Sequence, residues 1–87
     1  MAGPYEVRIR ASAEKELRAI GHRADQQRLV ERIEALGHDP RPPGCVKLTG
    51  ANAYRVRQGR YRIVYTVADA VLTVEVVRIG HRRDVYR

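Results

Sequence analysis

The alternation of apolar and polar residues along the chain predicts one strand, then two helices, then three further strands. Residues 5–10 alternate strictly between apolar and charged side chains, which is typical of a half-buried strand. Apolar residues then recur at helical spacing between residues 13 and 20. Ser12 precedes this segment as a predicted N-cap, and Gly21 follows it as a stop. The sequence therefore predicts a short first helix directly after the first strand.

A second helical pattern covers about Asp25 to Leu36 and ends at Gly37. Its apolar residues share one stripe: Leu29, Val30, Ile33 and Leu36. Residues 38–44 hold three prolines and a glycine, so they are expected to form a loop. Two short helices with a brief link predict an antiparallel hairpin, whose apolar faces need a sheet to cover them.

Three more strands are predicted at about residues 53–57, 60–67 and 71–79. Gln58-Gly59 and residues 68–70 are short enough to be hairpin connections, so these strands are expected to form an antiparallel meander. The chain of 87 residues is expected to be one domain, residues 1–87. The predicted fold class is α+β: a small antiparallel sheet in the order β-α-α-β-β-β, with the two-helix hairpin packed on one face.

Arginines alternate with the apolar residues of the predicted meander. If the apolar side chains face the helices, then Arg55, Arg57 and Arg62 converge on the opposite, open face of the sheet. A solvated strand face is the simpler interpretation. However, like charges on adjacent strands cost stability in the absence of an anion. The pattern therefore favours a functional site.

The positive charge is concentrated in the C-terminal part of the chain. The formal net charge is +7 and the isoelectric point is about 10.3. Residues 54–87 carry eight Arg against three acidic residues, a net +5, whereas residues 1–53 carry a net +2. A localised excess of cations indicates a polyanionic partner, such as nucleic acid.

Other features exclude several classes of protein. Cys45 is the single cysteine, so neither an internal disulfide nor a cysteine zinc site is expected. Three scattered histidines without an acidic cluster do not predict a metal site, and no cofactor is expected. No apolar run approaches 18 residues, and the N-terminal residues lack the features of a signal peptide. We therefore expect a cytoplasmic protein that does not associate with a membrane.

Several short motifs follow one another along the second half of the chain: Lys47-Leu48, Tyr54-Arg55-Val56-Arg57, Gly59-Arg60-Tyr61-Arg62-Ile63-Val64-Tyr65, Val76-Val77-Arg78-Ile79-Gly80-His81-Arg82 and finally Tyr86. In their order and spacing they resemble the RelE/ParE superfamily of bacterial and archaeal toxins, and the resemblance covers nearly the whole chain. The ending His-Arg-Arg-Asp-Val-Tyr is similar to the RNA-cleaving RelE branch. The gyrase-directed ParE branch usually lacks this arrangement.

The resemblance implies the toxin of a type II toxin–antitoxin system: an mRNA endoribonuclease that works in the ribosomal A site and is neutralised by a cognate antitoxin. Its implied partners are thus the antitoxin, the ribosome and mRNA. The family's catalytic basic residues fall on Arg55, Arg57, Arg62 and Arg82, and its tyrosine falls on Tyr86. We assign catalysis to five residues: Arg57, Arg62, His81, Arg82 and Tyr86. We assign RNA binding to four residues: Lys47, Arg55, Arg60 and Arg83.

The expected reaction is attack of the RNA 2′-hydroxyl on the neighbouring phosphate, without a metal ion. Arginine suits the charged phosphorane because its planar fork donates two parallel hydrogen bonds, and Arg62 and Arg82 are expected to form this clamp. Lysines are expected near Arg55 and Arg57 in this family. Because arginine is a very poor base, we expect Arg57 to stabilise charge. We hypothesise that His81 shares the acid–base work, since imidazoles titrate near neutrality.

Two alternatives remain open at this point. One is a ParE-like gyrase inhibitor without nuclease activity, in which the pair Arg82 and Tyr86 would have no catalytic role. The other is an RNA-binding module that does not cleave, in which alanine substitutions of these residues weaken binding alone.

Overall fold

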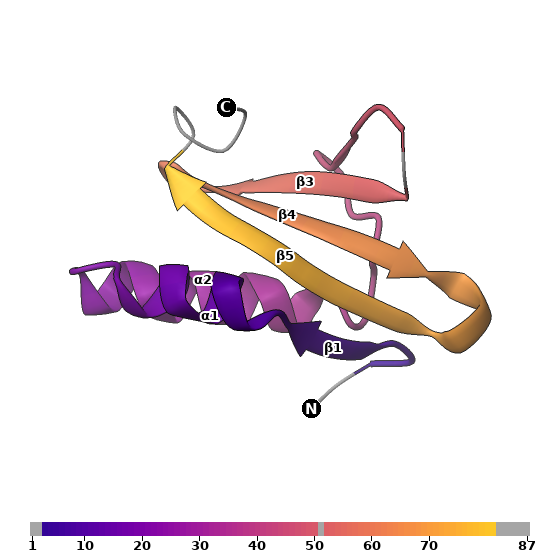
Figure 1. The fold of residues 1–87 in the computed structure, drawn as a ribbon, viewed down its shortest axis with the longest axis horizontal. Helices are drawn as coiled ribbons and strands as arrows, with labels where there is room; N and C mark the ends of the chain where they lie inside the picture. The colour runs from indigo at the N-terminus through magenta and orange to yellow at the C-terminus, as the bar shows by residue number, and fades with distance from the viewer. Residues whose placement is uncertain (1–2, 51, 82–87) are drawn as a thin grey trace.

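The computed structural model describes residues 3–50 and 52–81. Its elements follow the predicted order, with one additional short strand before the meander (Figure 1). The elements are β1 (Glu6–Ile9), α1 (Ala11–Arg18), α2 (Arg23–Ala35), β2 (Val46–Lys47), β3 (Ala53–Gln58), β4 (Tyr61–Ala68), the 3-10 turn η1 (Asp69–Val71) and β5 (Thr73–His81). Within the described part of the chain, neither helix is long and apolar enough to cross a membrane.

The sheet has five strands in the order β1-β5-β4-β3-β2. Strands β3, β4 and β5 form the predicted antiparallel meander, and β2 adds an antiparallel pair at one edge. The prediction of an antiparallel sheet is corrected at the other edge, where β1 pairs in parallel with β5. Parallel neighbours need a long connection, and the helix hairpin with β2 to β4 provides it. The sheet is therefore mixed.

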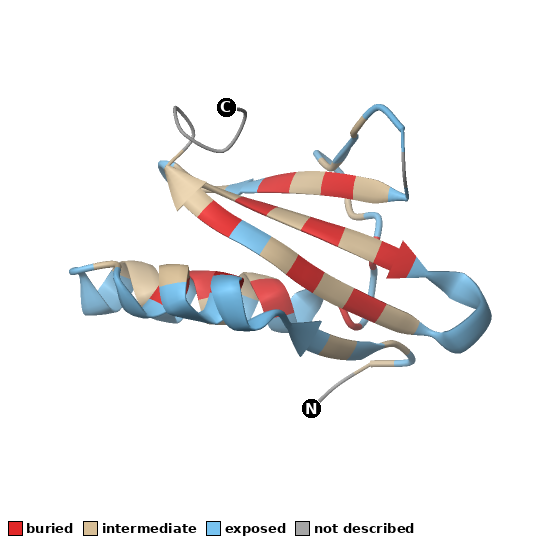
Figure 2. Cartoon of the chain, in the orientation of Figure 1, coloured by how far each residue is buried: buried red, intermediate tan, exposed pale blue. Residues whose placement is uncertain are grey.

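Both helices lie on one side of the sheet, as predicted (Figure 1). The buried core consists of apolar residues from the helices and from alternate positions of the strands: Ala13, Leu17, Leu29, Ile33, Leu36, Tyr54, Val56, Ile63, Tyr65, Val67, Val74, Val76 and Ile79. Figure 2 shows buried and less buried residues alternating along β3, β4 and β5. The period of two fixes which side chains meet the helices, and it leaves the other face of the sheet uncovered.

The start of α1 differs from the sequence prediction. Ser12 lies inside the helix, and Arg10 occupies the N-cap position in an extended conformation without a side-chain capping bond. The Arg10 N–H donates to the Val76 carbonyl at 2.9 Å. Strand pairing therefore holds the chain until this residue, and the helix begins directly afterwards.

The end of α1 is closed by a side chain of the second helix. Gln26 Nε2 donates to the carbonyls of Ile20 at 2.6 Å and Leu17 at 3.3 Å. The last carbonyls of a helix have no intrahelical partner. The same amide lies 3.3 Å from the Arg18 carbonyl, so it ties the last turn of α1 and the residues after it to α2. The helix ends at Arg18, before the predicted stop at Gly21.

The proline-rich loop is tied to the end of the sheet where β3 begins. The buried Tyr65 hydroxyl donates to the Pro40 carbonyl at 2.6 Å. Arg41 donates to Asp69 Oδ2 at 2.8 Å and, through Nε, to the Tyr54 hydroxyl at 3.0 Å. These bonds join the loop to β3 and to the β4–β5 turn, so the loop is held firmly in spite of its irregular backbone.

Candidate functional site

Three adjacent strands place four arginines on the face of the sheet that the helices leave open. In the register, Arg57 lies directly opposite Arg62, while Val64 lies between Arg55 on one side and Arg78 on the other. Directly opposite residues point to the same face. We call the surface formed by Arg55, Arg57, Arg62 and Arg78 the arginine face. The predicted convergence of the first three is present in the structure.

An irregularity in β5 determines which of its residues reach this face. Tyr65 pairs with Val76 and Val64 pairs with Arg78, so the register skips Val77. Such a bulge shifts the alternation of side chains by one residue. Val76 and Ile79 are consequently both buried although they are three residues apart. Without the bulge, Arg78 would point toward the helices; with it, Arg78 belongs to the arginine face.

The β3–β4 connection is a two-residue hairpin turn made by Gly59 and Arg60, since Gln58 already pairs with Tyr61. The predicted turn at Gln58-Gly59 is thus displaced by one residue. Gly59 has a φ of +61°, a conformation that suits glycine in such turns. Arg60 is exposed in the turn, at the same end of the sheet as Arg57 and Arg62.

His81 ends β5 beside this arginine pair but on the other face of the sheet. Its partner in the register is Tyr61, whereas the preceding Gly80 pairs with Arg62. The imidazole and the Tyr61 ring meet edge to face, with centroids 6.3 Å apart. His81 therefore lies at the same end of the sheet as Arg57 and Arg62, but on the opposite face.

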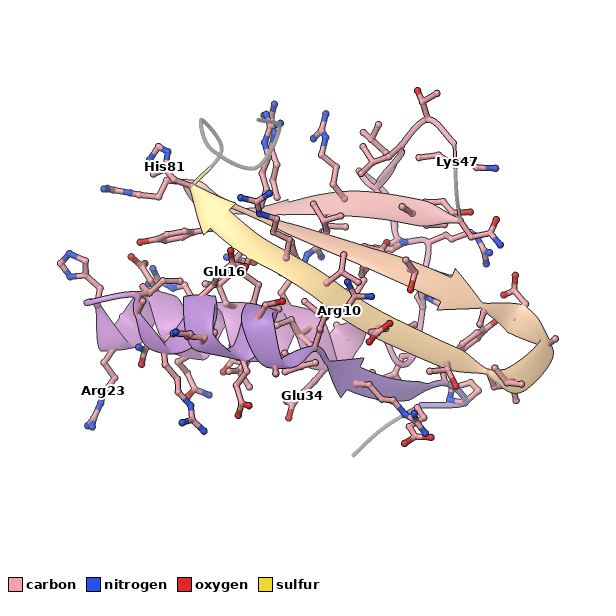
Figure 3. All side chains as sticks on the ribbon, in the orientation of Figure 1. Arg10, Glu16, Arg23, Glu34, Lys47 and His81 are labelled. Carbon is pink, nitrogen blue, oxygen red and sulfur yellow. The ribbon has the colours of Figure 1, made fainter. Side chains whose placement is uncertain are left out.

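The structure does not bring Lys47 to this region. Lys47 pairs with Tyr54 on the edge strand β2, so it is directed to the face opposite the arginines. Figure 3 shows Lys47 at one end of the sheet and His81 at the other. Arg82, Arg83 and Tyr86, three further predicted site residues, lie outside the described residues.

Strongly shifted pKa values occur at the opposite end of the sheet. Hydrogen bonds from Arg41 and then from Tyr5 hold the pKa of Asp69 below its ordinary value, and burial raises the pKa of Tyr65. Ala68, the last residue of β4 and the neighbour of Asp69, is six residues beyond Arg62, about 20 Å at the rise of an extended chain. Perturbed pKa values can mark active sites, but here they belong to the contacts that hold the proline-rich loop.

Cations from neighbouring strands, a phenol and an imidazole lie at the Arg57–Arg62 end of the sheet. Guanidinium groups bind phosphate oxygens through paired hydrogen bonds, and aromatic rings stack on unpaired bases. The Nε atom of Arg62 is buried, so this guanidinium is partly enclosed by the protein. This arrangement suits the sugar–phosphate backbone of a nucleic acid that lies across the strand ends.

Sequence reasoning missed two residues that the structure connects to this region. Arg78 joins the arginine face because of the bulge, and Glu16 of α1 reaches β5 next to it: its Oε2 lies 3.7 Å from the Arg78 Nε. The signal for Arg78 was the three-residue spacing between Val76 and Ile79, which breaks the period of two. No pattern in the sequence indicated that Glu16 would meet β5.

Comparison with known proteins gives matches along most of the chain. A family described as the ParE toxin of the type II toxin–antitoxin system parDE matches residues 7–86. Toxin RelG of Mycobacterium tuberculosis is 33% identical over 89 residues, covering 97% of this chain and 98% of that protein.

Two solved structures share the fold. The archaeal RelE–RelB complex of Pyrococcus horikoshii matches with a TM-score of 0.82 at 26% identity, covering 93% of this chain and 98% of that one. The M. tuberculosis toxin–antitoxin complex RelBE2 matches with a TM-score of 0.79 at 29% identity, covering 94% and 95%.

A small α+β fold with a cationic open sheet face, matched along its length by these proteins, defines the class: the toxin of a type II toxin–antitoxin system. Within that class, the chain belongs to the RelE/ParE superfamily, as its motifs predicted.

Proposed function

We propose that this toxin is an mRNA endoribonuclease that acts in the ribosomal A site in the cytoplasm and needs no metal ion. The observation that carries the proposal is the cross-strand pair Arg57 and Arg62 on the open face, one residue from His81 along the register. The similarity to toxin RelG and to RelE structures supports the same branch of the superfamily.

Cleavage would proceed by attack of the RNA 2′-hydroxyl oxygen on the adjacent phosphorus. The P–O5′ bond then breaks, which gives a 2′,3′-cyclic phosphate and a free 5′-hydroxyl. A base removes the 2′ proton, an acid supplies a proton to O5′, and cations stabilise the extra negative charge of the phosphorane. We assign the cationic role to Arg62 and Arg82, with Arg57 assisting. Arg55, Arg60 and Arg83 would hold the flanking phosphates.

Proton transfer and base stacking need groups other than arginine. We assign a share of the proton transfer to His81, and to Tyr86 either stacking on a base or orienting the 2′-hydroxyl. The expected pH–rate profile has a limb between about pH 5 and 8 that disappears in His81→Ala. An identical profile in both proteins would remove His81 from the mechanism and leave only contact with RNA.

A cognate antitoxin is the second proposed partner. The structures of RelE from P. horikoshii and of RelBE2 from M. tuberculosis are of toxin–antitoxin complexes. The net charge of +7 favours an acidic partner segment, which would cover the arginine face or add a strand to a sheet edge.

The test is to induce the toxin during active translation and to map mRNA 5′ ends by primer extension. Cuts inside codons are expected with the wild type, and their loss is expected with Arg62→Ala and with Arg82→Ala. Arg28→Ala is the matched control, because this arginine lies on α2 and pairs with Asp25 at 3.8 Å. Intact message with the wild type would overturn the nuclease proposal, and full cleavage by both variants would overturn the assigned site.

A gyrase-directed toxin is the second candidate, because the matching family is described as the ParE toxin of parDE. Stalled replication with intact message would favour it. A third outcome, RNA binding without cleavage that Arg62→Ala weakens, would favour a plain RNA-binding module.

A further inference from the structure

The outer edge of β5 changes its neighbour halfway along the strand. β1 pairs with residues 73–76 of β5, and the Arg10 N–H adds a last bond to the Val76 carbonyl. β5 continues to His81, five residues beyond that point. Helix α1 follows β1 directly and runs beside this second half of β5 (Figure 1). The backbone groups on that part of the edge therefore need partners other than a strand.

A carboxylate of α1 takes the place of the missing strand. Glu16 Oε1 accepts a hydrogen bond from the Ile79 N–H at 2.8 Å. Its Oε2 lies 3.7 Å from the Arg78 Nε, and Figure 3 shows Glu16 between α1 and the end of β5. A carboxylate accepts from a backbone N–H more strongly than a neutral oxygen does. The Glu16 side chain is 36% exposed, so the contact is partly shielded from water.

The residue that donates this bond lies directly before the strand end that carries the candidate site. Ile79 is 2% exposed and anchored in the core. The next residue, Gly80, lies opposite Arg62, and His81 lies opposite Tyr61. After the bulge at Val77, the ladder with β4 resumes from Arg78 to His81. The bond from Glu16 adds an anchor on the outer edge of this segment, which has no strand neighbour on that side.

We propose that Glu16 is a positioning residue of this toxin: it holds the end of β5 and the Arg78 guanidinium, and thereby fixes His81 at the strand end that also carries the Arg57–Arg62 pair. The proposal rests on the nuclease function proposed above. Glu16 does not touch substrate in this role. It acts through the Ile79 backbone, and Arg78 is turned toward the helix edge of the arginine face.

Two substitutions separate the hydrogen bond from the charge. Glu16→Gln keeps an oxygen that accepts from the Ile79 N–H but gives up the attraction to Arg78. Glu16→Ala removes both. Glu14→Ala is the matched control, because Glu14 is on the same helix and pairs with Arg18 at 3.0 Å on the exposed side.

The first measurement is residue-resolved amide hydrogen exchange of the purified toxin, which reports local opening. In Glu16→Ala, exchange of the Ile79 and Gly80 amides is expected to accelerate at least about tenfold, while amides of α2 and β3 stay unchanged. Glu16→Gln is expected within about threefold of wild type, and Glu14→Ala unchanged. Unaltered exchange at Ile79 in Glu16→Ala, or a uniform acceleration in all elements, overturns the proposal.

The second measurement is cleavage of ribosome-bound mRNA. Glu16→Ala is expected to lower kcat about tenfold or more with KM within about threefold, because misplacement affects the reacting geometry more than binding. Glu16→Gln should restore most of kcat. Equal kcat in wild type and Glu16→Ala, or no recovery with Glu16→Gln, overturns positioning through Ile79. If the wild type itself does not cleave, the nuclease proposal fails, and the exchange experiment still decides whether Glu16 holds the strand end.

Discussion

At the scale of single residues, the arginines at the two ends of the sheet have different surroundings. At one end, Arg57 and Arg62 are set opposite each other by the register, and no acidic residue shares their position in it. At the other end, Arg41 binds Asp69 and Tyr54 in a closed set of hydrogen bonds. The first arrangement gathers like charges on neighbouring strands, whereas the second uses its cation to hold the fold.

Because of the Arg41–Asp69 pair, the free energy of unfolding is expected to depend on pH. Hydrogen bonds from Arg41 and Tyr5 lower the pKa of Asp69. A carboxyl whose folded-state pKa is lowered stabilises the fold above its unfolded pKa of about 3.9, and that contribution is lost as the pH falls through the folded-state value. The urea midpoint of Asp69→Asn is therefore expected to be lower than that of the wild type at pH 7.

The same variant should also lose less stability on acidification below about pH 5, because the titrating group is absent. Parallel urea titrations at several pH values measure this. Glu31→Gln, on the exposed side of α2, is the control and should follow the wild-type curve. A wild-type-like acid dependence in Asp69→Asn would show that other carboxyl groups account for it.

At the scale of elements, the sequence predicted the helices and the meander well, because their apolar residues keep a strict period. It missed what depends on contacts between distant segments. Ser12 looked like a cap, yet Arg10 stays bonded to Val76 and fixes the helix start. The bulge that sends Arg78 to the open face appears only as one irregular spacing. No local pattern in the sequence indicates that β1 pairs in parallel with β5.

The β3–β4 turn is the element that keeps Arg57 opposite Arg62. At both Gly59 and Gly21, an added Cβ would meet nothing within 4 Å, but only Gly59 has a left-handed φ, at +61°. Gly59→Ala is therefore expected to cost about 1 kcal/mol through backbone strain.

Gly21→Ala, in the link between the helices, is expected to gain about 0.4–1 kcal/mol by restricting the unfolded chain. Urea unfolding of the two variants compares these signs directly. Gly59→Asn should recover part of the loss, since Asn tolerates this conformation. A loss of the same size in both alanine variants would contradict an origin in the turn conformation.

At the scale of the whole molecule, the two faces of the sheet carry different kinds of residue. Its helix-facing side carries the core, and its open side carries the arginine face (Figure 2). The excess of arginines after residue 53 was readable from the sequence, and four of the described ones, Arg55, Arg57, Arg62 and Arg78, lie on the open face. The placement of Lys47 and His81 on the opposite face was not readable from the sequence, since it depends on the register of β2 and of β5 after the bulge.

Because the core lies on one face of the sheet and the arginines lie on the other, substitutions on the two faces are expected to change the free energy of unfolding in opposite directions. Arg57→Gln removes one charge of a like-charge pair, so the free energy of unfolding is expected to rise by about 0.2–1 kcal/mol. Because the variant also lacks a proposed catalytic cation, most mRNA cleavage is expected to be lost. Ile63→Val removes one methylene from a fully buried side chain. It is expected to lower the free energy of unfolding by about 0.5–1.5 kcal/mol and to leave kcat near wild type.

Urea unfolding and cleavage of ribosome-bound mRNA measure the two quantities on the same protein preparations. The gain in Arg57→Gln should shrink as salt rises from 0.05 to about 0.5 M, because salt screens exposed charges, whereas the loss in Ile63→Val should not. If Arg57→Gln destabilises the protein and its cleavage falls only in proportion to the folded fraction, the arginine face is part of the scaffold. If stability rises while cleavage is lost, the toxin has kept a like-charge pair at the expense of its own stability, which is the pattern expected when function sets the residue.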